Sequence, residues 1–415
     1  MAKPFNTDAY PGRPRVLFVG LPLSSHTRAW IDLLADAELN VRLFALPAGK
    51  PPADWSVKAY VTAPHGDNLD PAVRASMWSR FRAVRLIQIR LPLLVQRRIG
   101  PFADRWLASV IRSWRPHVIH TFGVNPSGDF YFPVREKYGL EGIGKWVAQL
   151  RGGSDVQLVR HDPEGSARLA ELLTHCDHII TDNRANFDYL AGMGVPTEKI
   201  VPFAPVPGSG GVDVDALRAA WQGPPSTRRV IVWPKAYECP WSKALPVMEA
   251  LRACWQRLTP CTIHMLAMND EARAWYWTLP EGLRQHCRIS LRIPREEMLA
   301  LTSRARVMLV PSLVDGRPNS MLEAMAAGAF PIVSPLDSIR EVVNEEENVL
   351  FAGNLNVDEI ARALVRAMSD DGLVDRAAEA NLSVVRQVAD RAAIRPRVID
   401  FYEQLARSQQ ESNQS

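Results

Sequence analysis

The sequence contains few cysteines, and their spacing builds neither a disulfide framework nor a metal centre. Five occur in 415 residues: Cys176, Cys239, Cys254, Cys261 and Cys287. None forms a CxxC pair and the count is odd, which argues against structural disulfides and against a zinc site. We expect all five to be small buried apolar residues in a protein of the reducing cytosol.

Long hydrophobic runs are also missing. No stretch reaches the roughly 18 uninterrupted apolar residues of a membrane-spanning helix. Residues 1–15 contain three prolines and no apolar run, so we expect no signal peptide. These absences predict a cytoplasmic protein, and leave peripheral contact with the inner face of a membrane open.

The chain as a whole lacks a large excess of charge of one sign. Its net charge is +4, from 49 basic and 45 acidic residues, so a nucleic-acid partner gains no support. Apolar residues make up 47% and charged residues 23%, an ordinary globular mixture. At this length we expect two or three domains.

Two chemical signatures are absent from the sequence. No GxGxxG sequence follows a predicted strand, which disfavours a dinucleotide-linked dehydrogenase. There is no DxD sequence flanked by apolar strand residues, and the nine histidines are scattered. We therefore expect neither a metal nor a cofactor.

Short apolar runs alternate with longer amphipathic ones, which predicts parallel sheets with helices on both faces. A proline- and glycine-rich linker at residues 202–214 and a polar break at 222–229 divide the pattern in two. The predicted strands are residues 15–19, 41–44, 118–121, 146–150, 178–181 and 200–202 before the linker, and 230–233, 263–266, 289–291, 307–310 and 331–333 after it. The predicted helices include residues 26–37, 357–367, 376–388 and 394–405.

This alternation predicts an α/β protein of two Rossmann-like, doubly wound domains facing a cleft. We place the N-terminal, acceptor-side domain at residues 1–207 and the C-terminal, donor-side domain at 208–393. Residues 394–415 form a terminal helix, expected to pack back on the N-terminal domain, and a polar tail. Ligands bind at the carboxyl ends of the strands in such sheets.

The most informative segment follows the strand predicted at residues 307–310. A turn there carries Asp315 and Gly316, and a helix begins near residue 319 or 320 and ends at Gly328. Its first backbone N–H groups point outward and, with the helix dipole, form a seat for a phosphate. The predicted phosphate contacts are Asn319, Ser320 and Met321.

Two carboxylates flank this helix start. Asp315 precedes the helix and Glu323 lies one turn inside it. Beside a bound diphosphate, a carboxylate suits the hydroxyls of a ribose or a sugar, which donate hydrogen bonds to it. The alternative is a capping box, in which Glu323 merely accepts a hydrogen bond from the Ser320 backbone N–H.

Spacing, helix and following strand together resemble the retaining GT-B glycosyltransferases called glycosyl transferases group 1. That family has two acids separated by seven residues, a small-residue helix "EAMAxG", a strand and an "xEVV" segment. In this sequence the two acids are Asp315 and Glu323, and the small-residue helix is residues 323–328. The strand is residues 331–334, and the "xEVV" segment is residues 340–343. Weaker resemblance extends over most of the chain from Arg15 onward.

The resemblance implies a role for each of these groups. Glu323 would bind the donor ribose, and Asp315, where the family usually has glutamate, would contact the transferred sugar. Lys243 would stabilise the leaving diphosphate, and Lys235 would replace the usual arginine, a point charge in place of a bidentate fork. Two solvated surface lysines are the alternative.

Three stretches of the first half supply further candidates. Ser25 and His26 follow the first strand in a loop without the family's glycine pair, and a helix cap or surface histidine is the alternative. The stretch Arg151 to Asp155 resembles the family's "HGxD" turn, with a structural Arg151–Asp155 pair as the alternative. His120 ends another strand and is expected to line the cleft.

One segment is strongly basic. Between residues 71 and 116 ten arginines stand against one acid, Asp104, and they interleave with aromatic and aliphatic residues. The arginine-rich segment 74–115 suits a helix on an anionic membrane surface. Apolar faces packed on the sheet with a solvated arginine face, or a phosphate-rich soluble acceptor, explain the pattern equally well.

The predicted function is therefore metal-independent transfer of a sugar, with retention, from a nucleoside-diphosphate sugar. The acceptor is a glycan, a lipid-linked or a small molecule, as in polysaccharide or glycolipid biosynthesis by a hexosyltransferase. Two alternatives remain: a GT-B nucleotide-sugar hydrolase or epimerase, and a non-catalytic GT-B-like protein that binds nucleotide sugars.

Overall fold

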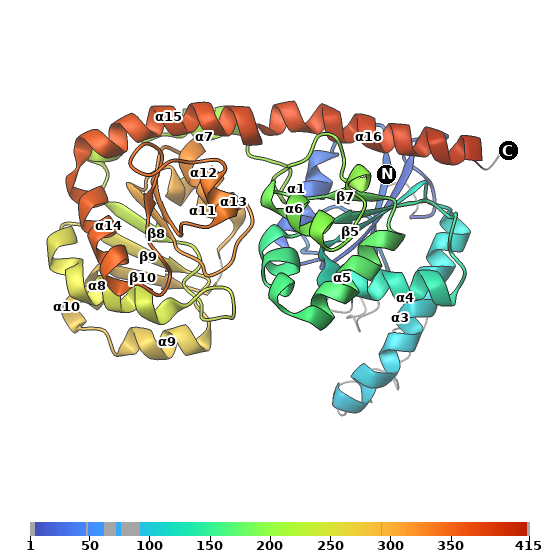
Figure 1. The fold of residues 1–415 in the computed structure, drawn as a ribbon, viewed down its shortest axis with the longest axis horizontal. Helices are drawn as coiled ribbons and strands as arrows, with labels where there is room; N and C mark the ends of the chain where they lie inside the picture. Colours follow the sequence, from blue (N-terminus) through green and yellow to red (C-terminus); the bar gives the residue numbers. More distant parts are fainter. Residues whose placement is uncertain (1–4, 47–48, 62–71, 76–91, 292, 413–415) are drawn as a thin grey trace.

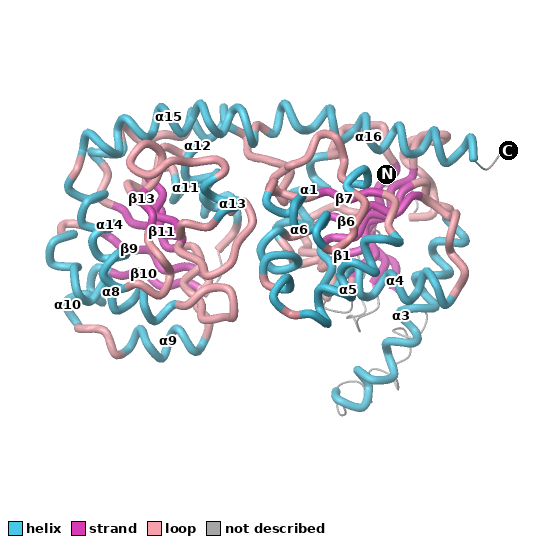
Figure 2. Tube along the Cα trace, viewed as in Figure 1, coloured by secondary structure: helices cyan, strands magenta, loops and turns pink. Residues whose placement is uncertain are grey.

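The chain forms two α/β domains, each built on a parallel sheet (Figure 1). The computed structural model describes residues 5–46, 49–61, 72–75, 92–291 and 293–412. Each sheet is sandwiched between helices, as the magenta strands inside cyan helices of Figure 2 show. This confirms the predicted pair of Rossmann-like domains.

Within the described residues, the first sheet has seven parallel strands, and the strand order reverses between β1 and β5. β1 pairs with β2 on one side and with β5 on the other. In spatial order the strands are β4 (Val73–Ala75), β3 (Ala59–Val61), β2 (Asn40–Ala45), β1 (Arg15–Gly20), β5 (Val118–Phe122), β6 (Lys145–Gln149) and β7 (His178–Ile180). The helices described in this domain are α1 (Ser25–Leu33), α3 (Pro92–Trp114), α4 (Asp129–Lys137), α5 (Pro163–His175) and α6 (Ala185–Gly192).

The second sheet has six parallel strands with a crossover between β8 and β11. Their order is β10 (Cys287–Ser290), β9 (Thr262–Leu266), β8 (Val230–Trp233), β11 (Val307–Val310), β12 (Phe330–Val333) and β13 (Leu350–Phe351). The helices that cover this sheet are α7 (Val214–Ala219), α8 (Ala244–Leu258), α9 (Asp270–Trp277), α10 (Glu281–His286), α11 (Arg295–Thr302), α12 (Asn319–Ala326), α13 (Asp337–Arg340), α14 (Val357–Ser369) and α15 (Asp371–Ala389).

The two domains have separate hydrophobic cores. Val201 and Val206 pack in the core of the first domain, whereas Val212 and Val214 pack in that of the second. The change of core thus falls inside the predicted linker, where proline and glycine prevent regular structure.

A pair of consecutive helices spans both domains. α15 packs against α12 in the second domain, and α16 (Arg391–Ser412) continues over the first (Figure 1). Ile394, Val398 and Phe401 of α16 are buried in the core that includes β1. The C-terminal helix therefore belongs physically to the N-terminal domain.

Several sequence predictions of elements need correction. Residues 200–202 form no strand; only Ile200 makes an isolated bridge, to Ile179. The first helix ends at Leu33, not at residue 37, because the chain turns there and Asp36 adopts a positive φ of 63°. The short strands β3, β4 and β13 escaped prediction, since two or three residues carry too little periodicity.

Four of the five cysteines are buried as expected, and Cys239 is partly exposed. All five are free thiols. Burial raises the pKa of Cys176 and of Cys254 to about 12, so these thiols are inert core groups.

Candidate active site

The carboxyl edges of the two sheets face each other, and their loops are in contact. Asp315 and Gly316, in the loop after β11, lie against Gly153 in the loop after β6. A Cβ on Gly153 would stand 2.7 Å from the Asp315 Cα, a separation that real Cβ atoms essentially never show. Glycine at 153 is therefore what allows the two domains to approach this closely.

Lys235 and Asp315 form the charged centre of this interface. Lys235 follows β8 and Asp315 follows β11, the two strands on either side of the crossover. The Lys235 Nζ makes an ion pair with the Asp315 Oδ2. Burial alone would lower the pKa of Lys235, but the Asp315 carboxylate, together with Tyr237 and Cys239, opposes it and the pKa is raised. The ammonium is thus held charged beside the Asp315 carboxylate.

The start of α12 lies between the domains rather than in the protein interior. Asn319 and Ser320 are partly exposed. The Asn319 side chain contacts His26 Nδ1 at 3.0 Å and accepts a hydrogen bond from Ser209 Oγ at 3.0 Å. The Ser320 Oγ is buried and has no hydrogen-bond partner in the described parts of the chain. A polar ligand would supply the partner that this hydroxyl lacks.

Glu323 does not cap the helix, so the capping-box interpretation is wrong. The N-cap residue of α12 is Pro318, and no side chain caps this helix. Glu323 is buried instead and pairs with Arg295, whose Nη2 lies 2.6 Å from the Glu323 Oε1. Burial raises the pKa of Glu323, and Arg295 opposes that rise. Arg295 is the first residue of α11, and sequence reasoning missed it because no short motif contains it.

His26 stands between four charged side chains. It remains accessible to solvent, yet both domains surround it. Its pKa is lowered to about 4, chiefly by desolvation; Lys235, Arg151 and Arg295 contribute to the lowering, and Asp315 opposes it. A neutral imidazole in a positive field is compatible with an anionic ligand at this place. Ser25 is the first residue of α1, whose N-cap is Ser24.

Arg151 and Asp155 form the structural pair that was the alternative interpretation. The Arg151 Nη2 lies 3.1 Å from the Asp155 Oδ1, and the Arg151 backbone N–H donates to the Asp155 Oδ2 at 2.8 Å. The guanidinium also donates to the Asn125 carbonyl. Its side chain is still 43% exposed, so it retains a face toward the interface.

His120 does not line the interface, which corrects the sequence prediction. It is fully buried, with Nδ1 at 2.7 Å from the Tyr402 hydroxyl and Nε2 at 3.0 Å from Gln149 Oε1. Burial lowers its pKa to about 3. Because Tyr402 belongs to α16, His120 fastens the C-terminal helix to the first sheet.

Lys243 lies at the N-cap of α8 and pairs with Glu238, at 2.8 Å between Nζ and Oε1. Its backbone is fixed by Asn354, which accepts from the Lys243 N–H at 2.7 Å and donates to its carbonyl at 3.1 Å. The structure joins Lys235, not Lys243, to Asp315, so the diphosphate role of Lys243 stays a prediction.

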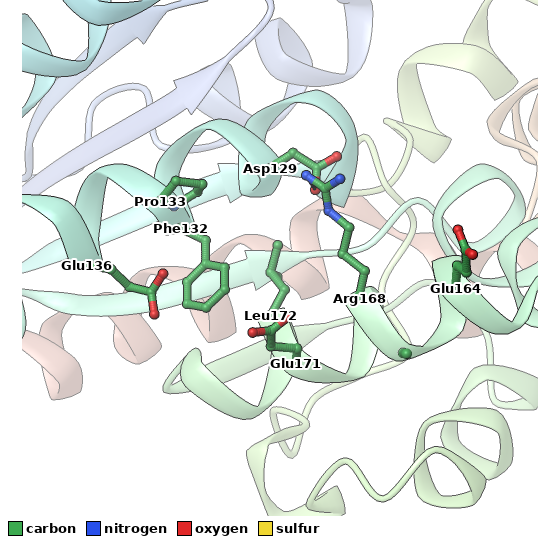
Figure 3. Close-up of a pocket in the computed structure, with 9 residues that line it drawn as sticks. Asp129, Phe132, Pro133, Glu136, Glu164, Arg168, Glu171 and Leu172 are labelled. Atoms are coloured by element: carbon green, nitrogen blue, oxygen red, sulfur yellow. Dashed lines mark ion pairs between the residues drawn. The ribbon is translucent and has the colours of Figure 1, made fainter.

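A groove of about 550 Å³ lies elsewhere, between α4 and α5 of the first domain (Figure 3). Phe132, Pro133 and Leu172 line it, and carboxylates surround them. Arg168 is paired with Asp129 at 3.0 Å. The excess of negative charge opposes a diphosphate, so this groove is not the donor site.

The described residues contain no cluster of three or more histidine, cysteine or acidic side chains placed to hold a metal. Over the same residues, no helix is both long and apolar enough to cross a membrane. Residues 76–91 of the arginine-rich segment, with four of its ten arginines, lie outside the described structure. Arg105 and Arg112 of α3 line a surface groove of about 470 Å³.

The loop after β11, α12 and α14 all fall within residues 249–383, and this range matches the family described as Glycosyl transferases group 1. The match contains the two acids and the small-residue helix on which the predicted resemblance was based. No curated protein sequence matches this chain.

Solved structures resemble the whole chain. Anabaena HepE in complex with UDP and glucose has a TM-score of 0.64 and 13% identity, covering 94% of this chain and 99% of its own. Sucrose-phosphate synthase of Thermosynechococcus elongatus has a TM-score of 0.68 and 17% identity, covering 95% and 100%. The apo lipopolysaccharide outer core galactosyltransferase WaaB has a TM-score of 0.55 and 12% identity, covering 96% and 99%. The chain has the GT-B fold of these glycosyltransferases.

Proposed function

We propose that this protein is a retaining glycosyltransferase that transfers a sugar from a nucleoside-diphosphate sugar without a metal ion. One observation carries the proposal: Lys235, Asp315 and the start of α12 meet at the interface of two Rossmann-like domains. The groups that a nucleotide sugar needs are all present there. Lys235 and the α12 backbone suit the diphosphate, and the two carboxylates suit hydroxyl groups.

The donor's ribose is assigned to Glu323 and its sugar to Asp315. Arg295 holds the buried Glu323 carboxylate at 2.6 Å, so an acceptor for hydroxyl donors is fixed in place beside α12. The HepE complexes contain UDP, with glucose or as UDP-glucose. By analogy of fold, UDP is the first nucleotide to test here.

In the proposed step, the bond between the sugar C1 and the diphosphate oxygen breaks as the acceptor oxygen bonds to C1. The acceptor proton passes to the departing phosphate, and attack on the same face retains the configuration. Lys235, Arg295 and the helix dipole supply the positive charge that stabilises the leaving group, which removes the need for a metal ion. Lys243 is proposed as a further diphosphate contact.

A thermal-shift screen of nucleoside diphosphates and nucleotide sugars tests this proposal, because a ligand that binds the native state raises its melting temperature. We expect at least one nucleoside diphosphate to stabilise the protein, and equally so with EDTA present. If no member of the panel shifts the transition, the proposal is wrong. Turnover of the donor without acceptor would instead indicate a hydrolase or epimerase, and binding without any turnover a non-catalytic protein.

A lipid-linked acceptor at an anionic membrane is the accompanying proposal for the arginine-rich segment. It rests on the sequence and on the exposed arginines of α3. Liposome flotation at low salt, with and without anionic lipid, tests it, and Arg105→Ala with Arg112→Ala is the variant to compare. Absence of the protein from both lipid fractions would rule out membrane contact.

A further inference from the structure

Asp182 is a buried acid at the domain interface to which the proposed reaction gives no role. It follows β7 in the first domain and is only 7% exposed. Its Oδ1 accepts a hydrogen bond from Asn183 at 2.7 Å. Its Oδ2 faces the second domain, where the Arg317 backbone N–H donates to it at 3.4 Å.

Two glycines make room for this carboxylate. A Cβ on Gly152 would collide with the Asp182 Oδ1, and a Cβ on Gly316 would collide with its Oδ2. Gly152 belongs to the first domain and Gly316 to the second. The carboxylate is therefore clamped between one loop from each domain, directly beside Asp315.

Other contacts hold the same loop to the first domain. Arg317 pairs with Glu341 at 2.9 Å, and the Glu341 carboxylate accepts from the Arg184 backbone N–H at 2.8 Å. Within its own domain, the loop's Leu313 N–H donates to the Trp241 carbonyl at 2.9 Å. Asp315 thus lies in a loop of the second domain that contacts of the first domain hold in place.

We propose that Asp182 is a positioning residue that holds the 315–317 loop against the first domain and so sets the geometry of Asp315. This inference rests on the proposed function for Asp315 itself. The donor's sugar contact then depends on closure of the two domains, whereas the diphosphate seat, built from the second domain, does not.

Protonation of Asp182 tunes this contact. Burial raises its pKa to about 7; Asn183 and Arg317 oppose the rise and the Asp315 carboxylate adds to it. Of the neighbouring charges, Arg317 is paired with Glu341, and Arg151, next to Gly152, is bound by the acid of its own turn. In an opened interface water would return the pKa toward 3.8. Proton binding therefore favours the closed contact, which weakens as pH rises through 7.

Hydrogen–deuterium exchange of a peptide spanning residues 311–318 reads this contact without any ligand. The Arg317 amide faces Asp182, whereas the Ser312 and Leu313 amides are bound within the second domain and serve as internal references. We expect Asp182→Ala to speed exchange at Arg317 at least threefold. Asp177→Asn, at the opposite end of β7, should leave it unchanged.

The pH dependence separates positioning from a merely structural role. At pH 5.5, the Arg317 amide should be protected from exchange equally well in wild type and in Asp182→Asn. At pH 8 it should be less protected in wild type, because Asp182 is then ionised whereas the asparagine stays neutral. Equal exchange of Arg317 in wild type and Asp182→Ala overturns the inference. If Asp182→Ala fails to fold, the test compares the Arg317 exchange rate of wild type with that of Asp182→Asn. A ratio of these two rates that is the same at pH 5.5 and at pH 8 overturns the inference.

A binding measurement then links the loop to the donor. UDP and UDP-glucose are titrated separately by calorimetry. Asp182→Ala should lower the affinity for UDP-glucose at least threefold more than the affinity for UDP. An equal loss of affinity for both ligands contradicts the inference. If wild type binds no nucleotide of the screening panel, the proposed function fails, while the exchange experiment still decides whether Asp182 holds the loop.

Discussion

The two domains share one sheet topology but place different chemistry where the strand order reverses. In the first domain this point lies between β1 and β5, where His26 follows β1 and the Phe18 and Phe122 rings of the two strands stack at 5.3 Å. In the second it lies between β8 and β11, whose loops carry Lys235 and Asp315. Parallel topology provides a place for a ligand, and the residues of the loops decide which ligand it suits.

Under the proposed function, the second domain is the donor side and the first has a supporting role. His26, Asp182 and Gly153 of the first domain all contact or approach the second domain's loop and helix start. Substitutions in the second domain should therefore weaken nucleotide binding more than substitutions in the first. Three binding measurements test that asymmetry, and a fourth, of stability, tests the acid that joins the two domains.

The largest effect is expected for Lys235→Ala, which removes the charge facing the diphosphate and leaves Asp315 without its partner. We expect the affinity for UDP to fall by about 2–3 kcal/mol, the cost of a lost hydrogen bond between charged groups. Isothermal titration calorimetry measures it. Lys145→Ala, which breaks a remote pair with Asp177, is the control and should bind UDP like wild type.

Glu323→Gln should weaken UDP binding by about 1–2 kcal/mol, because a neutral amide replaces the carboxylate that we propose accepts from the ribose. Arg295 also loses its charged partner, so the unfolding transition must be measured alongside calorimetry. Unchanged affinity for UDP in this variant would remove Glu323 from the donor site and weaken the case for the second domain.

Asp182→Asn should change the pH dependence of stability. The native pKa of about 7 lies above the ordinary 3.8, so the native protein retains a proton that the unfolded chain releases. This stabilisation is complete below pH 3.8 and is lost as pH rises through 7. Between pH 5 and pH 8 the variant should therefore gain about 2–3 kcal/mol relative to wild type, at roughly 1.4 kcal/mol per pH unit up to the native pKa.

Chemical denaturation at the two pH values measures that gain. His26 has a pKa lowered to about 4, so its contribution to stability changes with pH in the opposite direction and is lost as pH falls from 6.5 to 4. Because His26 is present in both proteins, this contribution cancels in the comparison. A difference between the variants that does not vary with pH would show that Asp182 is ionised throughout.

The smallest effect is expected for Arg151→Ala in the first domain. Its guanidinium is bound by Asp155 and by the Asn125 carbonyl, so the affinity for UDP should change by less than about 0.5 kcal/mol, the value of a typical exposed ion pair. A loss as large as that of Lys235→Ala, measured by the same calorimetry, would break the asymmetry between the domains.

Regular spacing made much of the fold predictable. The strands at residues 230–233 and 307–310 are confirmed to the residue, because buried parallel strands are continuous apolar runs between turn residues. The helix after Asp315 was found from its small residues and the C-terminal Gly328, which has a φ of 74°. Helix α15 begins at Asp371, five residues before its prediction, because Asp370 caps it by accepting a hydrogen bond from the Leu373 N–H.

Side chains paired across distant segments were not predictable. His120 was expected at the interface because it ends a strand, but the partner that buries it, Tyr402, is 282 residues away. Arg295 and Asp182 escaped notice for the same reason: their partners, Glu323 and the Arg317 backbone, come from other elements. The position of a residue at the end of a strand indicates at which edge of the sheet it lies. It does not indicate which distant segment packs over that residue.

By itself, the sequence determined the two α/β domains, the linker, and the turn and helix that carry Asp315 and Glu323, because local periodicity and turn residues are properties of short segments. Only the tertiary structure decided that Lys235 meets Asp315, that Glu323 binds Arg295 instead of capping its helix, and that Asp182 grips the opposite domain. These outcomes depend on which loops approach one another, and that is set by the packing of whole domains.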